Sequence, residues 1–259
     1  MKQIHYPGMP PRILYAGDDD IDRAAQYLGT LIHDAGYSFD YVPSSSPFPL
    51  TLRPESYDLI IISDYPAHQF TTLMLEATAA AVRHGSALLM IGGWESFHGS
   101  AGEYAGSILE TVLPVSLKKS DDRRNLSQGC IVLPAGQSVF SSTLPWTDPP
   151  LVGGFNEFTP KAGSHVLLTG RPLRIRNAPD LQAIVEDISV PLLVSADIDS
   201  GFAVALAFDL APHWVGGFVD WGNRRVRATL GDGFIEVGEL YHDFILCLIT
   251  FCLTKGTNV

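Results

Sequence analysis

Charged residues are scarce in this chain, and basic residues are fewer than acidic ones. They make up 17% of its 259 residues, with 17 Lys and Arg against 28 Asp and Glu, which gives a formal net charge of −11. Such a surface repels phosphate backbones and anionic lipid headgroups. Asp121 and Asp122 interrupt the one basic cluster, which comprises Lys118, Lys119, Arg123 and Arg124. We therefore expect a solvated loop there, and neither a nucleic-acid nor a membrane partner.

Cysteines and long apolar segments are also few. The three cysteines, an odd number in apolar surroundings, favour reduced thiols over a disulfide framework; they are Cys130, Cys247 and Cys252. The apolar segment 244–253 is well short of the roughly 20 residues that a membrane span needs, and predicts a buried helix. The first residues, MKQIHYPGMPP, contain no apolar stretch of the kind found in secretion signals. These absences predict a cytoplasmic protein.

Motifs for common cofactors are absent as well. No His and Cys spacing matches a zinc site, and no glycine-rich phosphate loop follows the first predicted strand. Asp18, Asp19 and Asp20 follow that strand and could hold a hard cation, but such a run more often caps a helix. We therefore expect no cofactor and no bound metal.

Hydrophobic residues, 46% of the chain, alternate between two periodicities in its first part. Short apolar segments predict strands at 12–16, 39–42, 57–63 and 86–91. Apolar residues three and four apart predict helices between them, at 21–35 and 70–84. This alternation is typical of an α/β fold, a doubly wound parallel sheet with helices on both faces.

The later part of the chain has more turn residues. Residues 116–163 are rich in Pro, Gly, Ser and Asp, which favours a β-rich insertion within a single domain of residues 1–259. That insertion is either a cover over a substrate or a plain surface excursion. An antiparallel hairpin is predicted at 191–196 and 201–209, and helices at 102–113 and 237–254.

The stretch SALLMIGGWESFHG, residues 86–99, organises the chain. Its strand stops at Gly92 and Gly93, which permit a sharp turn that presents Trp94 and the residues after it. The pattern predicts the shape of a nucleophile elbow, with no obvious nucleophile at its apex. Because ligands bind beyond the carboxyl ends of strands in open α/β sheets, we expect a site formed by residues 17–20, 64–66, 92–98 and 209–214.

Two segments resemble the class I glutamine amidotransferase-like superfamily. The elbow Gly-Gly-x-x-Ser-Phe at 92–97, with the LPV of 113–115 behind it, resembles a poorly characterised subgroup, as does APHWVGGFVDWG at 211–222. The resemblance spans most of the chain. It implies a three-layer, flavodoxin-like α/β sandwich with a mostly parallel sheet.

The same resemblance argues against the parent activity. In the parent family the apex is a cysteine that attacks the glutamine amide, activated by a His with a Glu behind it. The matching positions here hold Trp94, whose indole cannot form an acyl intermediate, and Asp209. The resemblance therefore implies a catalytically altered member that is not a glutaminase by a thiol of its own.

Our first hypothesis is that the former active-site cleft binds a small polar molecule, sugar-like by analogy with neighbouring families that act in carbohydrate use. The candidate catalytic residues are Glu95, Asp209 and His213. The candidate ligand-binding residues surround them: Gly93, Trp94, Ser96, Asp64, Tyr65, His98 and Trp214.

Two alternatives stay open. In the first, the chain is an enzyme of different chemistry, a hydrolase or isomerase that uses Glu95, Asp209 and His213 with or without a metal. In the second, it is a structural or interaction module in which Trp94 plugs the cleft. A serine hydrolase is disfavoured, because Ser96 lies two residues past the apex and lacks the Gly-x-Ser-x-Gly frame. As a structural module the chain is expected to dimerise through its sheet edge or its helices, so a homo-oligomer is one expected assembly.

Overall fold

The first part of the chain alternates between strands and helices, as predicted. The computed structural model describes residues 10–178 and 180–256. The elements of this part are β1 (Ile13–Gly17), α1 (Ala25–Asp34), β2 (Phe39–Val42), β3 (Leu59–Ser63), α2 (Thr72–Arg83) and β4 (Ala87–Ile91). Every residue of β1 and β4 is buried, and so is every residue of β3, as strands covered on both faces require.

The second part adds mainly strands. Its elements are β5 (Val115–Leu117), β6 (Arg123–Pro134), α3 (Val139–Thr143), β7 (Leu151–Asn156), β8 (Phe158–Pro160), β9 (His165–Ala178), β10 (Asp180–Val185), β11 (Val190–Ile198), β12 (Gly201–Leu206), α4 (Pro212–Val215), β13 (Arg225–Leu230), β14 (Gly233–Gly238) and α5 (Glu239–Leu253). The helix predicted at 102–113 is wrong, because only a 3₁₀ turn forms there, at Leu109–Val112. Glu103 and Gly106 have positive φ values of 56° and 80°, which no α-helix accommodates.

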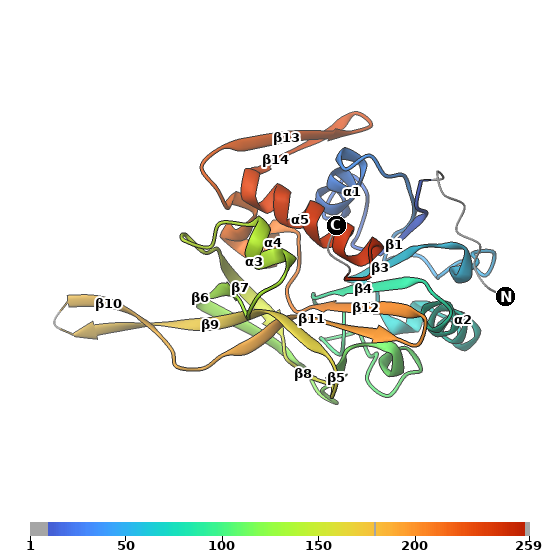
Figure 1. The fold of residues 1–259 in the computed structure, drawn as a ribbon, viewed down its shortest axis with the longest axis horizontal. Coiled ribbons are helices and arrows are strands. Elements are labelled where there is room, and N and C mark those ends of the chain that lie inside the picture. The colour runs from blue at the N-terminus through green and yellow to red at the C-terminus, as the bar shows by residue number, and fades with distance from the viewer. Residues whose placement is uncertain (1–9, 179, 257–259) are drawn as a thin grey trace.

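A ten-stranded mixed sheet forms the middle layer (Figure 1). Its order is β2-β1-β3-β4-β12-β11-β9-β6-β7, with β10 paired to β9. The strands from β2 to β12 pair in parallel, and those from β12 onward pair antiparallel. The predicted hairpin is β11 and β12, and β12 lies beside β4. The predicted α/β class, with its parallel central strands, is confirmed.

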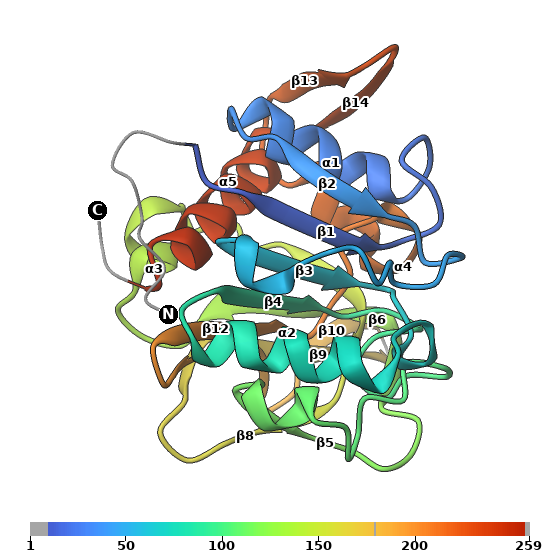
Figure 2. The ribbon, with the colours of Figure 1, turned by 90° about the vertical axis from the view of Figure 1, so that its right-hand side faces the viewer.

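Helices cover both faces of the parallel strands (Figure 2). α1 and α5 pack against each other on one face, and α2 lies on the other. The predicted C-terminal helix is α5, and it buries Tyr241, Phe244, Ile245, Leu248 and Ile249. Among the helices of the described residues, none combines the length and the apolar character that crossing a membrane requires.

Residues 116–163 contribute to the same sheet as the rest of the chain. β6 and β7 extend its antiparallel side, while β5 and β8 form a separate two-stranded sheet. β9 and β10 continue beyond the sheet as a two-stranded ribbon that projects from the molecule (Figure 1).

Candidate functional site

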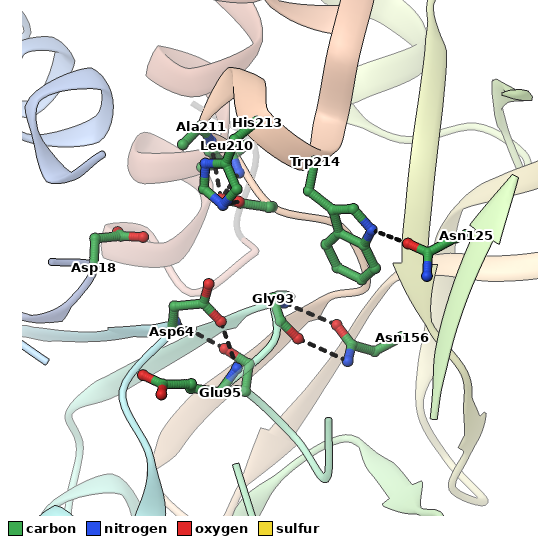
Figure 3. A network of polar contacts seen from close by, with 12 residues as sticks. Asp18, Asp64, Gly93, Glu95, Asn125, Asn156, Leu210, Ala211, His213 and Trp214 are labelled. Atoms are coloured by element: carbon green, nitrogen blue, oxygen red, sulfur yellow. Dashed lines mark hydrogen bonds and ion pairs between the residues drawn. The ribbon is translucent and has the colours of Figure 1, made fainter. Parts of the chain in front are cut away.

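Three aspartates follow strands of the parallel half at their carboxyl ends, and two of them, Asp18 and Asp64, are labelled in Figure 3. Asp18 comes directly after β1, Asp64 directly after β3, and Asp209 shortly after β12. The chain runs from β1 to β2 on one side and then to β3 on the other, so the strand order reverses between β1 and β3. A crevice at such a reversal is where open α/β sheets bind ligands.

The backbone turns sharply at two of these aspartates. Asp18 and Asp64 have φ values of 53° and 44°, in a region that aspartate tolerates better than most residues. At Gly17 a Cβ would lie 1.5 Å from the carbonyl oxygen of Ser63, so only glycine lets the strand ends come this close. The sequence suggested that the run from Asp18 to Asp20 caps α1. The structure differs, because the N-cap of α1 is Ala24 and no side chain makes a capping hydrogen bond there.

Asp209 and His213 form an ion pair. Nε2 of His213 lies 3.0 Å from Oδ2 of Asp209. Oδ1 of Asp209 accepts the backbone N–H groups of Leu210 and Ala211, at 2.6 and 2.9 Å (Figure 3). The adjacent carboxylate of Asp209 raises the pKa of His213 to about 9, and the imidazole stays half exposed. The carboxylate is thus held rigidly while the imidazole reaches solvent.

Asp64 approaches this pair from β3. Asp64, Asp209 and His213 each offer one ligand atom, and these atoms lie within 4.8 Å of one another. Oδ1 of Asp64 accepts the N–H of Glu95 at 2.7 Å, and the N–H of Asp64 donates to Oγ of Ser96 at 2.9 Å. Burial, followed by the charge of Asp209, raises the pKa of Asp64 to about 7. The structure therefore brings together five of the predicted site residues: Asp64, Glu95, Ser96, Asp209 and His213.

A polar cleft of about 500 Å³ lies beside this cluster. Its lining comes from the loops after β1, β2, β3 and β4 and includes Asp19, Arg23, Ser44, Ser45, His68 and Glu95. Burial raises the pKa of Glu95, against the opposing charge of His68. Glu95 links the two regions, because its N–H binds Asp64 while its side chain lines the cleft.

The turn after β4 differs from a nucleophile elbow. Such an elbow strains the backbone at the nucleophile and leads straight into a helix. Trp94 does not have a positive φ, and the next helical turn starts only at Leu109. Its indole is 49% exposed, and the guanidinium of Arg123 lies 4.4 Å from the ring centroid. Trp94 therefore lies on the surface, where it makes a cation–π contact with Arg123, and not within the aspartate cluster.

The side chain of Asn156, at the end of β7, holds Gly93. It accepts the N–H of Gly93 at 2.9 Å, donates to its carbonyl at 3.0 Å (Figure 3), and also donates to Asp122 at 2.7 Å. Asp122 in turn accepts the N–H groups of His98 and Gly99, each at 3.0 Å. The expectation of a solvated loop is wrong for Asp122, which is 1% exposed because these donors surround it.

Two predicted ligand-binding residues use their side-chain donors within the protein, and a third has a buried ring nitrogen. Tyr65 is fully buried, and its hydroxyl donates to the carbonyl of Ser46 at 2.7 Å. Trp214 is 7% exposed, and its Nε1 donates to Asn125 at 2.7 Å (Figure 3). Nδ1 of His98 is buried, with no hydrogen-bond partner among the described residues. The hydroxyl of Tyr65 and the indole N–H of Trp214 are thus already committed.

Sequence analysis did not identify Asn156 and Asp122 as site residues. Asn156 ends an apolar strand, where a polar side chain is a weak signal on its own. Asp122 was grouped with the neighbouring basic residues. Its hydrogen bonds reach residues 23 and 24 positions away, which no local pattern indicates.

None of the cysteines lies at this edge of the sheet. Cys130 is in β6, while Cys247 and Cys252 are in α5. Burial raises the pKa of Cys130 to about 12 and that of Cys247 to about 11. Because the thiolate is the nucleophile, such thiols are inert at neutral pH.

Solved structures of other proteins share the fold of this chain. The structure is similar to that of cytoplasmic protein STM1381 from Salmonella typhimurium LT2, with 26% identity over 93% of this chain and 99% of that one, and a TM-score of 0.71. For cytoplasmic protein STM3548 from Salmonella typhimurium the values are 23%, 93%, 98% and 0.70. A ThuA-like protein from Bacteroides uniformis shares the fold alone, at 13% identity, coverages of 80% and 85%, and a TM-score of 0.50.

No curated protein matches the chain. A family model described as "Putative glutamine amidotransferase" matches residues 16–229. The match covers both segments that carry the resemblance seen in the sequence. The chain therefore belongs to this glutamine amidotransferase-like family.

Proposed function

We propose that this chain binds a small, hydroxyl-rich polar molecule, such as a sugar, in the cleft beside Glu95. The observation that carries the proposal is the polar lining of that cleft, whose volume of about 500 Å³ suits a small-molecule ligand. Carboxylates and hydroxyls accept hydrogen bonds from sugar hydroxyls, and Arg23 donates. The names of the Salmonella relatives support a cytoplasmic location.

The proposal includes the absence of glutaminase activity by a thiol. The residue at the predicted apex is Trp94, and the position expected for the activating His holds Asp209. The raised pKa values of Cys130 and Cys247 support the same view. The exposure of Trp94 supports a binding role over a structural module, because an indole that plugged the cleft would be buried.

A ligand screen tests the proposal. Thermal shift with monosaccharides, sugar acids, amino acids and amides is expected to give a hit that raises Tm, confirmed by calorimetric titration. Glu95→Gln is expected to weaken that hit at least tenfold, while Glu76→Gln, on the exposed side of α2, leaves it unchanged. A panel with no hit, or equal binding by the two variants, would contradict the proposal.

An ammonia assay with glutamine tests the second half of the proposal. We expect no ammonia above the rate without protein. Ammonia release that stops when the thiols are alkylated would show that a cysteine does act as nucleophile.

A second candidate function is catalysis of hydrolysis or isomerisation by proton transfer. The geometry of Asp64, Asp209 and His213 favours it, because acid and base groups lie together beside the cleft. Asp64 then takes the role that the sequence suggested for Glu95. Any turnover of the screened ligand is expected to be lost in Asp64→Asn while the ligand still binds; turnover that persists would contradict this role.

A further inference from the structure

We infer that Asp64, Asp209 and His213, with Asp18 beside them, form a binding site for one divalent transition-metal ion such as Mn²⁺ or Zn²⁺. The inference stands independently of the sugar-like ligand proposed above. It rests on the convergence of these side chains from three separate strand ends and on buried oxygen atoms that have no hydrogen-bond partner in the described part of the chain.

The spacing of the ligand atoms fits a single ion. Two neighbouring ligands at about 2.1 Å from an octahedral ion lie about 3.0 Å apart, and opposite ligands lie about 4.2 Å apart. Nε2 of His213 is 3.0 Å from Oδ2 of Asp209, and the atoms offered by Asp64, Asp209 and His213 lie within 4.8 Å of one another. Small side-chain movements are enough to close this set around one ion.

Two buried carboxylate oxygens lack hydrogen-bond donors. Asp18 is 5% exposed, and the hydroxyl of Tyr15 donates to its Oδ2, but its buried Oδ1 has no hydrogen-bond partner among the described residues. Asp209 is 1% exposed, and its Oδ2 likewise has no hydrogen-bond partner among the described residues, although it lies 3.0 Å from Nε2 of His213 in the ion pair. Figure 3 shows the side chain of Asp18 on the same side of the sheet edge as Asp64 and His213. An unpartnered buried oxygen is costly, and a cation removes that cost.

Charge in this region is poorly balanced by the protein. Among the ion pairs of the described residues, His213 is the one cationic partner of these three aspartates. Several carboxylates at low dielectric repel one another, and a divalent ion converts that repulsion into attraction. The rigid anchoring of Asp209 by the N–H groups of Leu210 and Ala211 holds one ligand in place before the ion arrives.

The ligand types select the class of ion. Carboxylates alone suit Mg²⁺ and Ca²⁺, whereas an imidazole beside them shifts the preference to Mn²⁺, Fe²⁺ or Zn²⁺. His213 is half exposed, so it can rotate toward an ion, and its exposure leaves room for water or a ligand hydroxyl as a further ligand. We therefore expect Mn²⁺ and Zn²⁺ to bind more tightly than Mg²⁺.

Metal titration of the untagged chain, stripped with a chelator, tests the inference without any substrate. Elemental analysis after dialysis against Mn²⁺ or Zn²⁺ is expected to give one ion per chain, and calorimetry is expected to show weaker Mg²⁺ binding. Asp64→Asn and His213→Gln are each expected to raise Kd at least tenfold. The matched controls Asp232→Asn and His165→Gln, both at exposed positions, are expected to keep the wild-type Kd.

A spectroscopic readout identifies the imidazole. Electron spin echo spectra of the Mn²⁺-loaded chain are expected to show nitrogen coupling that disappears in His213→Gln and persists in His165→Gln. Circular dichroism checks that the variants stay folded. Less than about one tenth of an ion per chain, or the same Kd for Asp64→Asn and Asp232→Asn, would overturn the inference. Because no sugar is added, these results are separate from the outcome of the ligand screen.

Discussion

Gly93 lies against the carboxylate of Asp64 with no room for a side chain between them. A Cβ at Gly93 would lie 1.9 Å from Oδ1 of Asp64, and that oxygen also accepts the N–H of Glu95 at 2.7 Å. One carboxylate oxygen therefore connects the loop after β3 to the loop after β4. The position of Asp64 in the cluster depends on glycine at residue 93.

Gly93→Ala is expected to push Asp64 out of its place. Because the neighbouring atoms are packed, we expect a loss of about 1–3 kcal/mol in the free energy of unfolding, measured by urea denaturation. Gly136→Ala is the matched control, since a Cβ there meets no atom within 4 Å. Equal effects of the two substitutions would show that the contact between Gly93 and Asp64 is unimportant.

Asn156→Ala is expected to loosen the loop that contains Trp94 and Glu95. The substitution leaves the N–H and carbonyl of Gly93 without the Asn156 side chain as partner and removes one of the two donors to Oδ1 of Asp122, the other being the N–H of Gly99. Unpaired buried groups of this kind cost about 1–3 kcal/mol, so we expect a loss in that range on urea denaturation. Asn223→Ala, at an exposed position, is expected to stay within about 0.5 kcal/mol of wild type. A wild-type value for Asn156→Ala would contradict the role of the network.

The parallel half of the fold could be predicted from local patterns. β3 and β4 are uncharged and buried on both faces, and α2 begins at Thr71, whose Oγ1 accepts the N–H of Met74 at 3.3 Å. Thr71 is the N-cap that directly precedes α2, so each of these signals lies within one element or next to it. Asp64 and Asp209 could also be predicted as site residues, because the rule that strand ends meet at one edge needs only the strand assignments.

The remaining features depend on contacts between distant residues. Asn156 and Gly93 are 63 positions apart, so the network that shapes the loop after β4 has no local signature. The turn at Trp94 resembles an elbow in sequence, yet its backbone is set by this network rather than by Gly92 and Gly93 alone. Tyr65 follows Asp64 directly, but it points into the core, where it packs on Phe48 and Phe70.

Trp94→Ala is expected to change stability little. The indole is 49% exposed, and its contact with Arg123 is a cation–π interaction at the surface, worth about 0.5–1 kcal/mol. Trp221→Ala is the comparison, because that indole is 6% exposed and donates to the carbonyl of Asp148, so its removal is expected to cost about 3–5 kcal/mol. If urea denaturation gave Trp94→Ala the larger loss, Trp94 would be a core residue that plugs the cleft.

His242 is expected to make the stability of the fold depend on pH. It joins α5 to the end of α1, with Nε2 2.9 Å from Asp34 and Nδ1 3.0 Å from Asp243. Burial lowers the pKa of His242, but its hydrogen bonds to Asp34 and Asp243 outweigh burial, so the pKa is raised in the folded state. The unfolded chain titrates near the ordinary value of about 6.5. Protonated His242 therefore adds its full contribution to the free energy of unfolding at pH values below about 6.5. This contribution is lost as the pH rises through the higher folded-state pKa.

Urea denaturation of the wild type and of His242→Gln between pH 5.5 and 9 measures this contribution. The difference in unfolding free energy between the two proteins is expected to be largest at the acid end and to shrink toward the alkaline end, because groups common to both cancel. His165→Gln, at an exposed position with no ion pair among the described residues, is expected to show no such trend. A difference for His242→Gln that stays constant, or grows with pH, would mean that Asp34 and Asp243 do not stabilise the imidazolium, since a neutral His242 in the folded state would give no loss on the alkaline side.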